Sequence, residues 1–207
     1  MTKVMLYLIR HGKTSGNLLR QYLGSTDESL CCDGIDEINR YINQGIYPQV
    51  DNIFISPMAR CFETAALIYK NRCFTVLQGM KELDFGPFEG KTYDELRYTK
   101  DYQNWLASSG EEGPVGVESK SCFISRVTES FVEMLNKFNI SSPTAIVAHS
   151  GTFMALLSKY AGLDYYDGSI KSGNGFICTL EYDTNSDGLV VQESIKIYVK
   201  GTLLGEE

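Results

Sequence analysis

Two mainly apolar runs, each ending at a histidine, constrain the fold of this chain more than any other feature. Residues 4–9 lead directly into Arg10-His11, and residues 144–148 lead into His149. A short, continuous apolar run is typical of a strand buried on both faces, as in a parallel sheet covered by helices. Ligand sites in such sheets lie at the carboxyl ends of the strands. The pattern therefore predicts an α/β fold in which the two histidines share one site.

Strand and helix signals alternate along the rest of the chain. Two β-rich stretches near the C-terminus, 175–182 and 189–199, flank a turn-rich connection and are expected to form a hairpin. The other expected strands are 52–55 and 73–77. The expected helices are 34–44, 58–69 with Ser56 as its cap and Pro57 at its first position, 93–106, 123–138, and one that follows His149-Ser150-Gly151 and runs through Tyr160. This order predicts a three-layer α/β/α sandwich with a mostly parallel sheet, an antiparallel edge strand and a helical lid insertion at about 83–120.

Length and composition narrow the possible functions. The 207 residues fit a single domain, 1–207, and the net charge of −7 disfavours nucleic-acid and anionic-membrane partners. Six cysteines without a Cys-x-x-Cys spacing, and only two histidines, give no metal site. The first apolar run is too short for a signal peptide, and reduced thiols suit the cytoplasm. We therefore expect a cytoplasmic protein whose anionic substrate is held by a local cationic pocket.

The two histidine motifs belong to a series of short motifs that spans most of the chain. The series comprises Arg10-His11-Gly12 with Asn17, Gly24 to Asp27, Ser56 to Arg60 with Glu63-Thr64-Ala65, Glu82 to Gly86 with Phe88-Glu89-Gly90, and Ala148 to Gly151. In this order the motifs resemble the histidine phosphatase superfamily, which includes the phosphoglycerate mutases. The stretch 20–28 is similar to α-ribazole phosphatases, and broad-specificity phosphatases share much of it.

The residue types in these motifs suit phosphoryl transfer. A neutral imidazole, with a reference pKa of about 6.5, is an available nucleophile at neutral pH, so His11 is the candidate to form a phosphohistidine. Arg10 and Arg60 are candidates to bind the phosphate, because a guanidinium stays charged and pairs with two phosphate oxygens at once. This charge compensation requires neither a metal nor a cofactor.

The resemblance implies roles for the other candidates. It makes His149 a further donor to the phosphoryl group, which adds positive charge when protonated, and it makes Glu82 the proton donor to the leaving group. A carboxyl near a phosphate has a raised pKa, which would keep Glu82 protonated. Asn17 is a candidate for donating its amide to a phosphate oxygen, while Thr14 and Glu89 are expected to order loops.

The resemblance leaves the reaction type open between hydrolysis and transfer. Mutases of the superfamily have Arg after the acid, where this chain has Leu83, and they are longer, so a phosphatase acting on a small phosphomonoester, with α-ribazole 5′-phosphate as the specific candidate, is the favoured interpretation. The alternatives are a cofactor-dependent phosphoglycerate mutase and a catalytically silent phosphate-binding module. Beyond the residues needed for phosphate we expect no clear cation for a carboxylate, although Lys13, Arg20 and Lys81 stay open, as does the oligomeric state.

Overall fold

A six-stranded mixed sheet forms the centre of the computed structural model, which describes residues 1–138 and 140–205. The strands β1 to β6 lie in the order β3-β2-β4-β1-β5-β6, and the first four of these run parallel. β5 pairs antiparallel with β1, and β6 pairs antiparallel with β5, so both antiparallel ladders lie at one edge. The strand bounds are β1 Thr2–Arg10, β2 Asn52–Ile55, β3 Thr75–Val76, β4 Thr144–Ala148, β5 Gly175–Tyr182 and β6 Lys196–Thr202.

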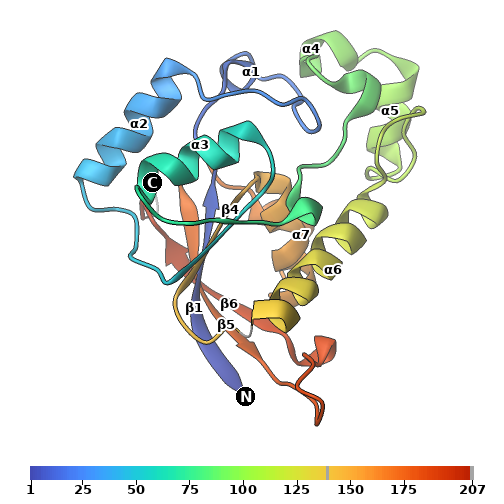
Figure 1. The fold of residues 1–207 in the computed structure, drawn as a ribbon. Coiled ribbons are helices and arrows are strands. Elements are labelled where there is room, and N and C mark those ends of the chain that lie inside the picture. Colours follow the sequence, from blue (N-terminus) through green and yellow to red (C-terminus); the bar gives the residue numbers. More distant parts are fainter. Residues whose placement is uncertain (139, 206–207) are drawn as a thin grey trace.

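Helices cover both faces of the sheet, which confirms the predicted three-layer α/β/α sandwich (Figure 1). The α-helices are α1 Ser15–Leu18, α2 Cys32–Asn43, α3 Ala59–Ile68, α4 Tyr93–Leu96, α5 Lys100–Ala107, α6 Lys120–Phe138 and α7 Ser150–Tyr160, and the 3₁₀ turns are η1 Gln78–Met80, η2 Gly86–Phe88, η3 Tyr165–Gly168 and η4 Gln192–Ser194. No helix in the described part of the chain is long and apolar enough to span a membrane.

The alternation of side chains along the strands explains how two layers of helices can pack on one sheet. Successive side chains of a strand point to opposite faces. Leu8 of β1 and Ile146 of β4 therefore pack into the core that includes α6 and α7, whereas Ile9 and Val147 pack against α3 on the other face. Because apolar side chains on both faces are removed from water, the central strands read as continuous apolar runs in the sequence.

Several predicted boundaries are wrong in detail. The helix predicted from Met58 begins at Ala59, and its N-cap is Met58 rather than Ser56, whose hydroxyl is bonded to His149 instead. The stretch 73–77 contributes only the two residues of β3, and 189–199 forms a strand only from Lys196. The expected helix 93–106 is two helices, because Thr99 adopts an extended conformation at the start of α5.

The helical insertion lies beyond the carboxyl ends of the central strands. In Figure 1, α4 and α5 occupy the same end of the molecule as α1, which follows β1. Phe88, Leu96 and Tyr102 form a small core of the insertion, and Tyr22, from the segment after α1, packs against it. The Tyr22 and Tyr102 hydroxyls are also hydrogen-bonded. The insertion is thus attached to the loop that follows the first histidine motif.

Candidate active site

Three adjacent parallel strands place the central polar residues side by side. β1 pairs with β4 up to Arg10 opposite Ala148, and the ladder continues as the His11 amide donates to the Ala148 carbonyl at 3.0 Å. On the other side of β4, the Ser56 amide donates to the Val147 carbonyl at 3.0 Å. The rings of His11 and His149 consequently lie 5.1 Å apart, centroid to centroid. The prediction that the two histidines lie together is confirmed.

The environment of His11 favours a neutral ring with one free nitrogen. Nδ1 lies 2.7 Å from the Gly12 carbonyl oxygen, which can only accept a hydrogen bond, so Nδ1 carries the proton and Nε2 has a free lone pair. Burial, followed by the positive charges of Arg10 and Arg60, holds the pKa of His11 well below 6.5. His11 is therefore neutral at neutral pH, with an unprotonated Nε2.

His149 is fully buried between polar and sulfur contacts. Its Nε2 shares a hydrogen bond of 2.8 Å with Ser56 Oγ and lies 3.6 Å from Cys61 Sγ. The pKa of His149 lies well below 6.5. Burial is again the largest cause, and the charges of the site come next. The resemblance implies that His149 adds positive charge when it is protonated. In the free protein the ring is neutral at neutral pH, because desolvation disfavours the charged form.

The two arginines are held by backbone carbonyls. Arg10 NH1 donates to the Ile170 carbonyl at 2.5 Å, while its buried Nε makes no hydrogen bond with a described residue and so remains a donor for an anion. Arg60 lies in the first turn of α3, and its two terminal nitrogens donate to the carbonyls of Thr26 and Gly24 at 2.8 and 2.9 Å. Both guanidinium groups are thus fixed before any ligand binds.

Glu82 lies against the start of α7. Its Oε2 accepts from the Gly151 amide at 3.0 Å, and its Oε1 accepts from the Leu83 amide at 2.9 Å. A Cβ at Gly151 would lie 2.1 Å from Oε1, so the Gly allows this close approach. Burial raises the pKa of Glu82 even though the two amides and the arginines lower it, so desolvation is the dominant effect.

Arg126 of α6, which belongs to none of the sequence motifs, holds the backbone around Glu82. Its NH1 donates to the Gly79 and Lys81 carbonyls at 2.8 and 3.2 Å, and its NH2 reaches the Glu82 carbonyl at 3.4 Å. Nε and NH2 also pair with both carboxylate oxygens of Glu118, at 2.9 and 2.7 Å. A single Arg on an amphipathic helix gives no local signal of such a role.

Loop-ordering residues behave largely as the sequence suggested. Thr14 caps α1, and the Asn17 carboxamide oxygen accepts from the Thr14 amide, which leaves the Asn17 NH₂ as a donor. Glu89 accepts from the amides of Gly24, Ser25 and Thr26 at 2.9 to 3.2 Å, and from the Phe85 amide as well. Arg60 binds carbonyls of the same loop. The loop is therefore held through its amides by the carboxylate of Glu89 and through its carbonyls by the guanidinium of Arg60.

A cavity of about 1180 Å³ opens beside this centre. Arg10, which precedes His11, and Asn17 both line it. Lys13 and Arg20, whose contact with a substrate the sequence left open, line it too, whereas Lys81 is not among its described lining residues. The sequence could not place these side chains in one wall, because the segments that carry them meet in space only once α1 and α2 are packed.

The fold and the paired strand-end histidines together define a known class of α/β protein. The family model of the histidine phosphatase superfamily, branch 1, matches residues 6–193, so the chain belongs to this family. Family membership and the phosphatases among its relatives identify the chain as a phosphoric monoester hydrolase.

Three comparisons illustrate the range of relatives. The chain is 30 % identical to a putative phosphoserine phosphatase 2 of Hydrogenobacter thermophilus over 76 % of this chain and 79 % of the relative. It is 26 % identical to the adenosylcobalamin/α-ribazole phosphatase of Salmonella typhimurium over 74 % and 78 %. The fold matches that of a putative α-ribazole-5′-P phosphatase from Escherichia coli with a TM-score of 0.75, at 21 % identity over 95 % and 96 % of the two chains. Phosphoglycerate mutases also occur among the relatives.

Proposed function

We propose that the chain hydrolyses small phosphomonoesters through a phosphohistidine on His11. The observation that supports this most directly is the state of His11: a neutral ring, a free Nε2, and two arginines near enough to lower its pKa. Arg10 and Arg60 would neutralise the equatorial oxygens of the phosphoryl group, with His149 and Asn17 as further donors. Positioning and charge compensation are what phosphoryl transfer requires of a protein.

The two steps balance with these residues alone. In the first, His11 Nε2 forms a bond to phosphorus as the ester P–O bond breaks, and Glu82 gives its proton to the departing alkoxide. In the second, water attacks the phosphohistidine, its proton passes to the Glu82 carboxylate, and His11 leaves as the neutral imidazole with inorganic phosphate released. The raised pKa of Glu82 suits the acid of the first step and the base of the second.

The names of the relatives suggest a substrate, and the free cysteines suggest a cellular location. α-Ribazole 5′-phosphate and phosphoserine are the specific candidates, since relatives of this chain are named for acting on them. All six cysteines are free thiols, which suits a reducing cytoplasm. We further propose that 1–207 acts as one domain in which the insertion at about 83–120 is the lid over a small-molecule site, with no nucleic-acid or membrane partner.

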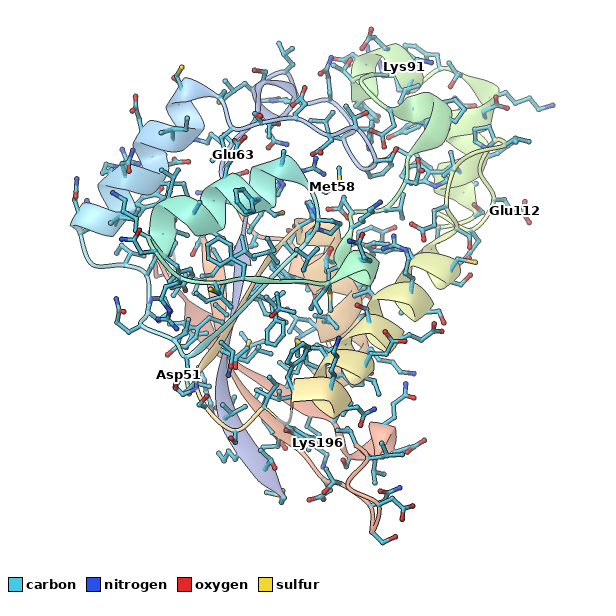
Figure 2. The ribbon with its side chains drawn as sticks, viewed as in Figure 1. Asp51, Met58, Glu63, Lys91, Glu112 and Lys196 are labelled. Atoms are coloured by element: carbon cyan, nitrogen blue, oxygen red, sulfur yellow. The ribbon has the colours of Figure 1, made fainter. Side chains whose placement is uncertain are left out.

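Labelling of His11 tests the proposal. Wild-type protein treated with a ³²P-labelled phosphomonoester should acquire label that is lost in acid and retained in base, and His11→Ala should acquire none while keeping its circular dichroism spectrum. Lys196→Gln, an exposed charge change at the far end of the molecule, is the matched control and should label normally (Figure 2). Activity should persist in EDTA, because arginines supply the positive charge. Undiminished labelling of His11→Ala would exclude this nucleophile.

Absence of turnover would favour the silent binding module instead. In that case wild-type protein would bind inorganic phosphate but release none from any ester. The mutase alternative is favoured by one observation, the additional cations of the cavity, and it is distinguished by following the fate of the phosphoryl group.

A further inference from the structure

The cavity beside the candidate active site is strongly basic although the whole chain is acidic. Its described lining includes five basic side chains and one acidic side chain, Glu37, in a chain of net charge −7. The basic residues are Arg10, Lys13, Arg20, Arg40 and Lys171. A cleft lined by one sign of charge concentrates ligands of the opposite sign. We name this cavity wall the basic basin.

Most of this charge is separate from the phosphate-binding residues. Glu37 offsets at most one unit: its Oε1 pairs with Lys13 at 2.9 Å and lies 3.7 Å from Arg40. Arg20 makes no ion pair with a described residue. Among the charged side chains of the basin, Arg10 is the only one that is also proposed to bind the transferring phosphoryl group, so the described basin retains net positive charge after that group is bound.

None of the residues 82–86 of the acid motif is among the described residues that line the basin. Its charged residues come from the end of β1, from the segments on either side of α1, from α2 and from the segment 169–174. The residue after Glu82, which is Arg in mutases of the superfamily, is here the buried Leu83 and contributes no charge. A second anionic group on a substrate would therefore find its cations in the basin rather than beside Glu82.

We propose that the preferred substrate carries a second anionic group, phosphate or carboxylate, on its leaving group, and that the basic basin binds it. This inference rests on the proposed phosphatase function and specifies its substrate class. Of the two candidates named for that function, phosphoserine carries a second anion, its carboxylate, and α-ribazole 5′-phosphate does not. Arg10 would contact the phosphoryl group, while Arg20, Lys13 and Arg40 would receive the distal anion. Guanidinium groups pair well with both phosphate and carboxylate oxygens, so the shared chemistry is anion recognition.

The size of the basin leaves room for leaving groups larger than the three carbons of serine or glycerate. Ligand pockets for small molecules usually measure about 300–1,000 Å³, and this cavity is about 1180 Å³. The Tyr22 and Tyr41 side chains also line it and offer aromatic surface. A sugar or nucleoside between two anionic groups would fill such a space.

Matched substrate pairs that differ only in the second anion test the proposal. The pairs are fructose 1,6-bisphosphate with fructose 6-phosphate, adenosine 3′,5′-bisphosphate with adenosine 5′-monophosphate, and 3-phosphoglycerate with glycerol 3-phosphate. We expect kcat/KM in wild-type protein to be at least about tenfold higher for the doubly anionic member of a pair, the size of effect that one charge-assisted contact produces. The first two pairs identify a distal phosphate, and the third identifies a distal carboxylate.

Two variants assign the preference to the basin. Arg20 has a positive φ of 57°, so Arg20→Asn is chosen because Asn tolerates this conformation. Arg40→Gln changes a side chain that is 61 % exposed on α2. The double variant should lose about tenfold or more in kcat/KM for the doubly anionic substrates and remain unchanged for the singly phosphorylated ones. Lys196→Gln is again the control and should change neither.

The outcomes separate this inference from the proposed function. Hydrolysis of both members of every pair at similar rates would overturn the inference and leave the phosphatase proposal intact. A preference that survives the double variant would also overturn it, because the anion would then be bound elsewhere. If the folded protein hydrolyses no ester, the proposed phosphatase function is wrong, and the inference that rests on it is wrong as well.

Discussion

At the scale of single residues, burial sets the protonation states that the chemistry needs. It lowers the pKa of His11 below 6.5 and raises that of Glu82 above its usual value of 4.5, so each group moves toward the form that its proposed role requires. His11 is neutral above its lowered pKa, and Glu82 is protonated below its raised pKa. The free protein should therefore be most active at mildly acidic pH, with an acid limb from His11 and a basic limb from Glu82.

Replacement of Glu82 by Gln tests the role of its proton. Glu82→Gln should lower kcat for an alkyl phosphate by about 10²- to 10⁴-fold, because a poor leaving group needs the proton. The loss should be smaller with p-nitrophenyl phosphate, whose phenolate departs unaided, and the basic limb of the pH profile of kcat/KM should disappear. Equal losses with both substrates would show that Glu82 positions the site rather than protonating the product.

How much of the site could be predicted depends on whether a residue's role is local. His11 and His149 were predictable because a strand end is visible in the sequence and parallel strands share one edge. Ser56 was assigned to a helix cap, since the sequence does not show that β2 lies next to β4 and brings its hydroxyl to His149. Arg126 and the basic basin depend on contacts between distant segments, for which a single sequence has no pattern.

At the scale of elements, α6 supports the acid segment through the Arg126–Glu118 pair. Arg126 binds three carbonyls of the segment 79–82, and Glu118 exchanges hydrogen bonds with the backbone of Asp84, its amide donating at 2.9 Å and its Oε2 accepting at 3.3 Å. The segment between these contacts includes Glu82. The pair thus fixes the backbone on both sides of Glu82.

Arg126→Ala should therefore reproduce part of the Glu82 phenotype. We expect kcat for an alkyl phosphate to fall by about tenfold or more, with a smaller fall for p-nitrophenyl phosphate, since about 1 Å of misplacement reduces rates by up to 10²-fold. Arg126→Lys retains charge without the planar fork and should recover only part of the loss. If Arg126→Ala lowers the melting temperature but reduces both substrates equally, the pair stabilises the fold without positioning the acid.

At the scale of the whole molecule, the layer order was predictable and the lengths of peripheral elements were not. Central strands such as β4 are buried on both faces, which leaves an unmistakable apolar run. β3 keeps only two residues at the sheet edge, where one side of a strand has no partner and β-rich composition is a weak guide. The break between α4 and α5 lies at Thr99, whose extended backbone no glycine or proline in the local sequence predicts.

The architecture as a whole also bears on whether the phosphoryl group reaches water or another hydroxyl. A mutase must keep the dephosphorylated product bound and aligned with the phosphohistidine, which requires cations in fixed positions. The distal cations here lie at the surface: the Arg40 side chain is 61 % exposed and the Lys13 side chain is 37 % exposed. They suit capture of an anion better than its alignment, and a cavity of about 1180 Å³ leaves room for water beside a three-carbon product.

We therefore expect hydrolysis to exceed transfer. With 3-phosphoglycerate and 2,3-bisphosphoglycerate as primer, release of inorganic phosphate should be faster than formation of 2-phosphoglycerate, as measured by ³¹P nuclear magnetic resonance on one sample. His11→Ala should abolish both reactions, which links them to the same phosphohistidine. Interconversion faster than phosphate release would mean that the basic basin holds the glycerate long enough to exclude water, and the chain would then work as a mutase.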